Sequence, residues 1–362
     1  LGSLWVFHLL AVLKVGLMER VGFSVGGAGQ AISGGFIIYM ESYGATIFLA
    51  LWSFWLGRQH LRRVWHQVLT GAGDSREVAH YRLVLAGLVL SAIYVVYWLV
   101  GLGMSLTLAL GSFVLMTLVY FVLAKLVAAT GFTYLLPRGV DMKGQTFITV
   151  LIGSAYLPAR DMVAYKLFTS KAFFGYQQVP AWPALTHLLR IFSLRQQPRW
   201  VSAVVFVAFP VGFLVAAWAA IDLAYDEGGA VFLSHKGDRA YNDMVHNMHN
   251  PRFPALGYWG IWFSGFFEAA AIAFMRGRFH WFPLHPIGPA FQNTHGIQFY
   301  WFSLFLVWLV KVTLLHYGGA KVFRAGKPFF YGLGIGYVVG VTLSGAVDLI
   351  WFPVDSHPVH GW

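Results

Sequence analysis

The sequence predicts an all-α membrane protein, a polytopic bundle of about seven to nine transmembrane helices. Apolar runs long enough to cross a hydrocarbon core about 30 Å thick recur along the 362-residue chain. Hydrophobic residues make up 58% of it and charged residues only 11%, whereas soluble domains carry about 25% charged residues. Lys and Arg gather in short segments between the apolar runs, as in cytoplasmic loops. We therefore interpret the net charge of +11 as membrane topology and exclude nucleic acid as a partner.

The first half of the chain contains three predicted spans. The connection between the first two, residues 57–81, is rich in arginine and is predicted to be a cytoplasmic loop. The second and third spans form a helical hairpin that turns at residues 101–103. The three spans cover residues 36–56, 83–100 and 106–127.

Two irregular features precede these spans. Residues 4–17 are apolar but short for a span, and residues 21–35 are dense in glycine, which disfavours a regular helix. We interpret the glycine-dense segment as a surface loop or, alternatively, as a broken segment at membrane depth. Such a segment must be covered by protein or line a water-filled cavity. The sequence starts at Leu1 without a methionine, and we expect it to be part of a longer protein.

The second half adds longer connections and the remaining spans. Within the connecting segment 128–199, residues 146–157 are too short for an upright span. Residues 185–195 predict one amphipathic helix in the membrane interface or, alternatively, a cytoplasmic helix packed on the bundle. Residues 222–256 form a second, polar connection. Further spans are predicted at residues 200–224, 257–275, 296–315 and 329–351. We expect a single integral membrane domain over residues 1–362.

A proline-rich segment, residues 283–291, interrupts the second half. Each of its prolines removes a backbone donor and disfavours helix at the residue before it, so the segment cannot be a regular span. Basic residues also lie on both sides of the following span, which calls for an extra turn of the chain. We expect the segment to dip into the protein interior as a re-entrant half-helix. The alternative is an extended loop at the surface.

Ionisable residues within or beside the spans are the first candidates for function. A charge at bilayer depth costs about 2.5–3.5 kcal/mol and usually faces protein or a water-filled cavity. We expect Glu268 to face protein, either paired with Lys311 or lining a proton or ion path. Lys311 lies near its helix end, where snorkelling to the interface is the alternative. The candidate transport or ion pathway consists of Glu41, Glu268, Lys311 and His285, with Lys14, Lys125 and Asp348 more peripheral.

Histidines are the second group of candidates. A helix would place His246 and His249 on one face, which predicts a zinc or copper site, although the pattern offers no third spaced ligand. His8 and His316 adjoin apolar runs. A histidine there is able to ligate a haem iron or a chlorophyll magnesium, or to bond a backbone carbonyl. We leave the cofactor open and expect bound lipids.

Several function classes lack their sequence signals. The chain has no cysteine, which excludes disulfides, thiolate chemistry, iron–sulfur ligation and cysteine zinc sites. It contains no phosphate-binding loop, no dinucleotide fingerprint, and no serine-hydrolase or metalloprotease motif. We therefore expect that the protein is not an enzyme.

Two motifs near the C-terminal end carry a family resemblance. They read RGRFHWFPLHPIG at residues 276–288 and HYGGAKVFRAGKPFFYGL at residues 316–333. With them the chain resembles the C-terminal portion of an uncharacterised family of bacterial and archaeal polytopic membrane proteins. That family consists of two adjoining domains of unknown function and is distantly similar to the oligopeptide transporter superfamily. Phe282 stands where Trp is usual, and the acidic element expected after the hairpin reads AATGFT at residues 128–133.

The resemblance and the charged spans support two hypotheses. The first is an oligopeptide-transporter-like secondary transporter that moves a small solute or a metal chelate along an ion gradient. The second is a non-catalytic transmembrane scaffold or accessory subunit of a larger respiratory or photosynthetic complex. Both imply a multi-pass protein of the bacterial inner membrane, in contact with lipids and with other membrane subunits or further copies of itself.

Overall fold

A computed structural model describes most of the chain and shows helices as its regular elements. The described residues are 1–21, 34–130, 151–167, 198–226, 228, 242, 244–251, 253, 254 and 256–351. Their contacts divide the chain into two compact units, Leu1–Trp301 and Phe302–Trp362. The predicted all-α class is confirmed for the described residues, none of which lies in a strand.

Five described helices are long and apolar enough to cross a membrane. They are α2 (Gly34–Thr70), α3 (Ser75–Gly101), α4 (Leu106–Thr130), α8 (Pro198–Asp226) and α12 (His295–Trp351). Shorter helices, α1 (Gly2–Val21), η2 (Ser154–Tyr156), α6 (Ala159–Leu167), α10 (Leu256–Arg278) and α11 (Ile287–Phe291), lie between and around them. Five such helices indicate a multi-pass membrane protein.

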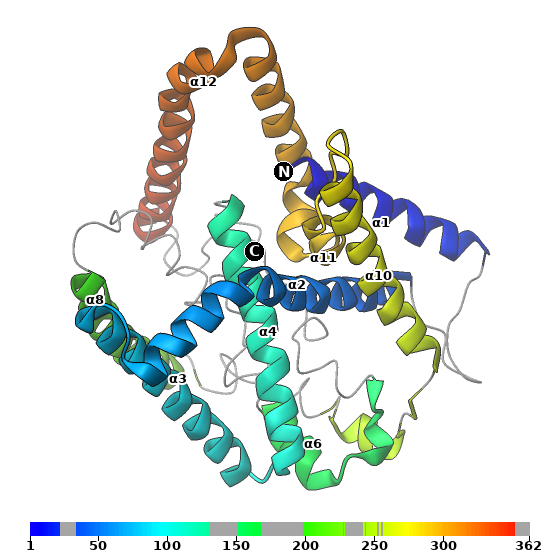
Figure 1. Cartoon of the computed structure of the whole chain (residues 1–362), viewed down its shortest axis with the longest axis vertical. Coiled ribbons are helices and arrows are strands. Elements are labelled where there is room, and N and C mark those ends of the chain that lie inside the picture. Colours follow the sequence, from blue (N-terminus) through cyan, green and yellow to red (C-terminus); the bar gives the residue numbers. More distant parts are fainter. Residues whose placement is uncertain are drawn as a thin grey trace. The chain divides into compact units, whose positions relative to one another are not determined.

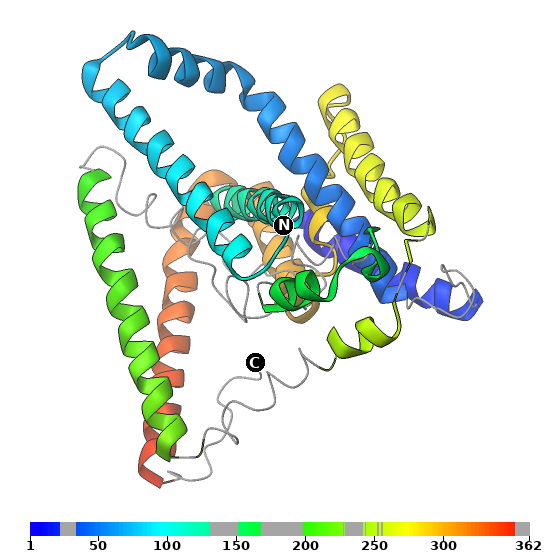
Figure 2. The ribbon, with the colours of Figure 1, turned by 90° about the horizontal axis from the view of Figure 1, so that it is seen from below.

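Helix α2 is the buried centre of the first unit. In its most apolar stretch 67% of the residues are buried, against 6% in α3. Helix α10 packs across it (Figures 1 and 2). A Cβ atom on Gly44 would lie 1.9 Å from the carbonyl oxygen of Trp262, and one on Gly265 would lie 2.0 Å from that of Glu41. The two backbones therefore touch, which only glycine permits at these positions.

The proline-rich segment forms a short buried helix, α11, as the half-helix prediction required. Residues 288–291 of this helix are buried, and it packs against α1 and α2. A Cβ atom on Gly288 would lie 2.1 Å from the ring of Phe7, so α1 also approaches closely. Just before α11, the backbone N–H of His285 donates to Ser3 Oγ at 2.9 Å. The expected alternative of an extended surface loop is wrong for this segment.

Helices α3 and α4 form the predicted hairpin. Gly103 turns the chain with a φ of 104°, a region that favours glycine. Helix α6 packs beneath this turn, where Asp161 accepts a hydrogen bond from the backbone N–H of Ser105 at 2.7 Å and Arg160 Nε donates to the carbonyl oxygen of Gly103 at 2.7 Å. A small hydrophobic cluster closes the junction: Leu99, Met104, Leu108, Ala109, Ala164 and Tyr165.

The connection predicted as a loop over residues 57–81 is mostly helical, so that prediction was wrong. Helix α2 continues to Thr70, and α3 begins at Ser75 behind the N-cap Asp74, whose side chain accepts a hydrogen bond from the N–H of Arg76. Residues 58–70 contain neither glycine nor proline and are rich in Arg, Leu and Gln, which are strong helix formers. The arginine content shows that this segment is basic, but it does not predict that the segment is helical.

In the second unit, residues 302–351 belong to α12, which folds back on itself (Figure 1). The only non-helical residue within α12 is Gly319, with φ 63° and ψ −170°. The two predicted spans at 296–315 and 329–351 are both helical and lie on either side of this bend. The basic segment between them is helical too, apart from Gly319.

Several predicted features fall outside the described residues. These are most of the glycine-dense segment, the amphipathic helix at 185–195, the first part of the apolar run at 146–157 and much of the connection 222–256. The single-domain organisation stays a prediction.

Candidate functional site

Three charged side chains from three helices meet in the first unit. Glu41 of α2 is buried, with 4% of its surface exposed, and forms an ion pair through Oε1 with Lys14 Nζ of α1. Ser264 of α10 donates a weaker hydrogen bond to the same carboxylate oxygen at 3.5 Å. The close approach of α2 and α10 at Gly44 and Gly265 places these groups together.

Glu268 completes this charged cluster. It is half-buried on α10, one helical turn beyond Ser264, and it interacts electrostatically with Glu41 and Lys14. Glu268 thus has charged neighbours within the first unit, whereas the partner that the sequence suggested was Lys311. Glu41 Oε2 is buried and forms no hydrogen bond with any described residue. One lysine beside two carboxyl groups cannot neutralise both, so the cluster is suited to holding a proton or a cation.

A row of hydroxyl groups runs along α2 beyond the charged cluster. Ser42, Thr46 and Ser53 each donate a hydrogen bond to the carbonyl oxygen four residues earlier, at 2.9, 2.8 and 2.6 Å. Such bonds satisfy a hydroxyl in apolar surroundings without a partner helix. The row therefore places hydroxyl groups on α2 with little free-energy cost for burying them.

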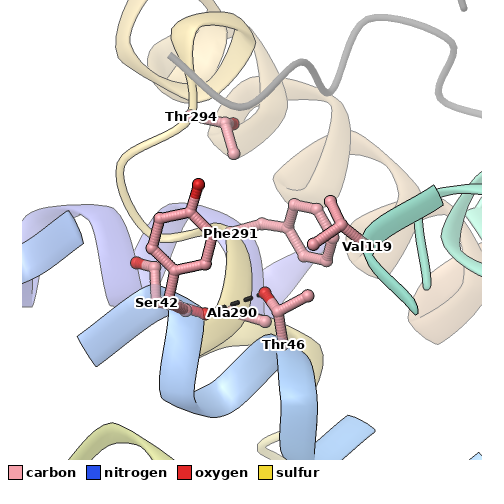
Figure 3. Close-up of a pocket in the computed structure, with 7 residues that line it drawn as sticks. Ser42, Thr46, Val119, Ala290, Phe291 and Thr294 are labelled. Atoms are coloured by element: carbon pink, nitrogen blue, oxygen red, sulfur yellow. Dashed lines mark hydrogen bonds between the residues drawn. The ribbon is translucent and has the colours of Figure 1, made fainter. Parts of the chain in front are cut away.

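The first cavity beside this row is very small (Figure 3). It measures about 10 Å³ and lies where α2, α4 and the α11 region meet. Its lining includes Ser42, Thr46, Val119, Phe291 and Thr294. A water molecule needs about 10–15 Å³ of such space. This cavity is a gap between packed helices and is too small for a solute.

The second cavity is much larger, about 280 Å³. Helices α2, α4 and α10 and the chain entering α11 surround it. Its apolar walls include Trp52, Leu56, Leu126 and Ile287. The polar side chains that reach it are Ser53, Lys125, Arg276 and His285.

The polar groups of this cavity are partly connected. Lys125 Nζ donates to Ser53 Oγ at 2.6 Å. His285 Nδ1 accepts a hydrogen bond from the backbone N–H of Ile287 at 3.1 Å. Burial, and next the charge of Arg276, lower the pKa of His285 to about 4. His285 is therefore neutral at pH 7, and because Nδ1 accepts, its proton is on Nε2.

The structure brings some of the predicted site residues close together and leaves others apart. Glu41 and Glu268 lie in the charged cluster, and His285 lines the larger cavity. Lys311 lies in the second unit, exposed, with Nζ 5.8 Å from the ring centre of Phe323, and its pairing with Glu268 stays a prediction.

The four histidines predicted as possible ligands lie in different surroundings. His246 and His249 are exposed, and the described residues include no group of three metal-ligating side chains. His8 is buried and donates through Nδ1 to the carbonyl oxygen of Gln292 at 2.9 Å, the non-cofactor role considered for it. His316 is exposed and stacks edge-on with Tyr317.

Sequence reasoning placed Lys14 and Lys125 at the periphery and assigned no site role to Ser53 or Arg276. A usable signal existed for the larger cavity, because Lys125 and Arg276 are basic residues at the ends of predicted spans. No comparable signal existed for Lys14, whose partner is on another helix.

Comparison with known proteins assigns the chain to a family without a described activity. No curated protein and no solved structure matches it. The model of a family of unknown function, DUF6785, matches residues 1–359, nearly the entire sequence. The chain therefore belongs to the family of unknown function DUF6785.

Proposed function

We propose that this protein is a secondary transporter of the bacterial inner membrane that moves a small solute or a metal chelate along an ion gradient. The observation that carries the proposal is the charged cluster of Lys14, Glu41 and Glu268 among apolar helices. Ionisable groups at bilayer depth cost about 2.5–3.5 kcal/mol each on insertion scales. Proteins that keep them commonly use them to carry protons or ions.

The broken helical element supports the same function. Transporter sites are typically built where a helix is interrupted, because the free backbone groups there contact solute or ion. Helix α11 is such an element, and the residues just before it line the larger cavity. The resemblance of the C-terminal motifs implies a function of the oligopeptide-transporter kind, in line with this proposal.

In this role the charged cluster binds the coupling ion and the larger cavity receives the solute. Twelve residues of α2 separate Glu41 from Ser53, about 18 Å along the helix. The two sites are thus distinct but share α2 and α10. Transport requires no bond to be made or broken in the solute, so we propose that the protein is not an enzyme.

The second candidate function is a non-catalytic scaffold that holds other membrane subunits or a second copy of this chain. The ion pair between Lys14 and Glu41 is the observation that favours this function. Under it, the pair does no more than hold α1 against α2. Under this hypothesis the carboxylates matter for stability and not for ion movement.

Reconstitution into liposomes separates the two functions. Currents are recorded on a solid-supported membrane while a panel of small carboxylates, phosphate, amino acids and iron citrate is applied under a proton gradient. A transporter gives a solute-dependent current that falls at least about ten-fold in Glu41→Gln and Glu268→Gln. Glu77→Gln is the matched control, since Glu77 is exposed at the start of α3. Absence of current with every solute, together with stable co-purifying subunits, would favour the scaffold.

A further inference from the structure

The larger cavity presents uncompensated positive charge. Both Lys125 and Arg276 line it, and none of the described residues in its lining is acidic. Lys125 bonds only the neutral hydroxyl of Ser53, and Arg276 has no hydrogen-bond or ion-pair partner among the described residues.

Two cations that share an apolar-walled cavity repel each other. Trp52, Leu56 and Leu126 form apolar walls beside the two cations, whose side chains are exposed outside the cavity. An anion between the cations would replace repulsion by two attractive contacts. Arginine is suited to this role because its planar fork binds carboxylate and phosphate with two parallel hydrogen bonds.

A third donor is available at the same place. His285 accepts at Nδ1 from Ile287 N–H, which leaves Nε2–H as its donor. A neutral imidazole donates a hydrogen bond to an anion without adding a third charge. The Ser53 hydroxyl, which contacts Lys125, holds the ammonium group at the cavity wall.

We propose that this cavity is a binding site for a small anion, a carboxylate or phosphate group held between Lys125 and Arg276. The volume of about 280 Å³ corresponds to roughly nine water molecules at about 30 Å³ each, just below the range of about 300–1,000 Å³ for small-molecule pockets. A phosphate or short dicarboxylate fits this space and an oligopeptide does not. The inference rests on the proposed function only where the anion is taken as the transported solute.

Two sources supply this chemistry: a soluble anion and the headgroup of an anionic lipid. The test therefore measures binding directly, on the whole chain purified in a neutral detergent. Radiolabelled inorganic phosphate is bound at equilibrium in a scintillation proximity assay, and succinate is added as competitor. We expect saturable phosphate binding that succinate displaces.

Three variants decide whether the cavity is the site. Arg276→Gln and Lys125→Gln are each expected to weaken phosphate binding at least about ten-fold, as expected for loss of a charge-assisted hydrogen bond. Arg278→Gln is the matched control, since Arg278 ends the same helix without lining the cavity, and it should bind as the unmodified chain does. Arg276→Lys keeps the charge but loses the planar fork, so it should bind phosphate more weakly than the unmodified chain and more tightly than Arg276→Gln. No saturable binding, or equal loss in Arg278→Gln, overturns the proposal.

A second arm identifies the source of the anion. The chain is placed in nanodiscs of phosphatidylcholine with or without phosphatidylglycerol, and phosphate binding is repeated. Loss of binding in phosphatidylglycerol assigns the site to a lipid headgroup, whereas equal binding in both assigns it to a soluble anion. The binding assay uses no ion gradient. If no anion binds, only the anion site is ruled out, whereas the proton-coupled current tests the transporter proposal separately.

Discussion

Gly265 of α10 contacts the backbone of Glu41 of α2 so closely that a Cβ atom on the glycine would lie 2.0 Å from the Glu41 carbonyl oxygen. Gly265→Ala is therefore expected to push the two helices apart and to destabilise the protein by about 1–3 kcal/mol. Thermal unfolding in detergent measures the loss. Gly260→Ala is the matched control, because Gly260 lies on the same helix in open space. An equal loss in both variants would contradict a specific contact.

The ion pair between Lys14 and Glu41 is expected to be strongly coupled. Lys14→Met alone leaves a buried carboxylate without its cation and should cost about 1–2 kcal/mol, less than for a fully buried pair because Lys14 is 40% exposed. Lys14→Met combined with Glu41→Gln should recover much of that loss, since neither charge is then left behind. A double-mutant cycle of unfolding free energies measures the coupling. Additive effects would show that the two side chains act independently.

Asp161 is expected to stabilise the start of α4 by capping it from another segment. Asp161→Ala removes the buried carboxylate that accepts from the Ser105 N–H, so we expect a loss of about 1 kcal/mol. The exposed cap of α3, Asp74, provides the comparison, because water replaces its side chain in Asp74→Ala. Thermal unfolding should show the smaller loss for Asp74→Ala, and the reverse order would argue against this capping role.

The pKa of His285 predicts a pH dependence of stability. The folded state holds this pKa at about 4, below the ordinary value of 6.5, so the unfolded chain binds the proton more readily. The contribution of neutral His285 to the free energy of unfolding is fully present above pH 6.5 and is lost as the pH falls toward 4. His285→Gln should flatten this part of a melting-temperature profile. His246→Gln, at an exposed position, should leave the profile unchanged.

The basic helical extension of α2 is expected on the cytoplasmic side. The chain has no cysteine, so a single introduced thiol is an unambiguous reporter. Gln59→Cys should resist an impermeant maleimide added to intact cells and react after lysis, because arginine-rich connections stay inside. Ser105→Cys, at the opposite end of the α3–α4 hairpin, should react from outside. The opposite labelling pattern would reverse the topology.

Sequence alone located the five long apolar helices and the proline-rich half-helix, because run length and missing backbone donors are local properties. It also predicted a span at residues 257–275, and α10, which covers them, is not among the five. It identified Glu41 and Glu268 because carboxylates are rare in such runs. It did not predict Lys14 as their partner or the gathering of Ser53, Lys125 and Arg276. Those contacts depend on how α2, α4 and α10 cross. The contact at Gly44 and Gly265 brings α2 and α10 together, and no single-helix pattern encodes these crossings.

The contact at Gly44 and Gly265 also has a mechanical consequence. Ser53 lies nine residues beyond Gly44, about 13 Å along α2, and Arg276 lies eleven residues beyond Gly265, about 16 Å along α10. If the contact at Gly44 and Gly265 acts as the pivot, a change of about 10° in the crossing angle would displace the far ends by about 2.5 Å relative to each other. The charged residues beside the contact would hardly move. The joint therefore amplifies a small rearrangement around Glu41 into an opening or narrowing of the cavity at Arg276.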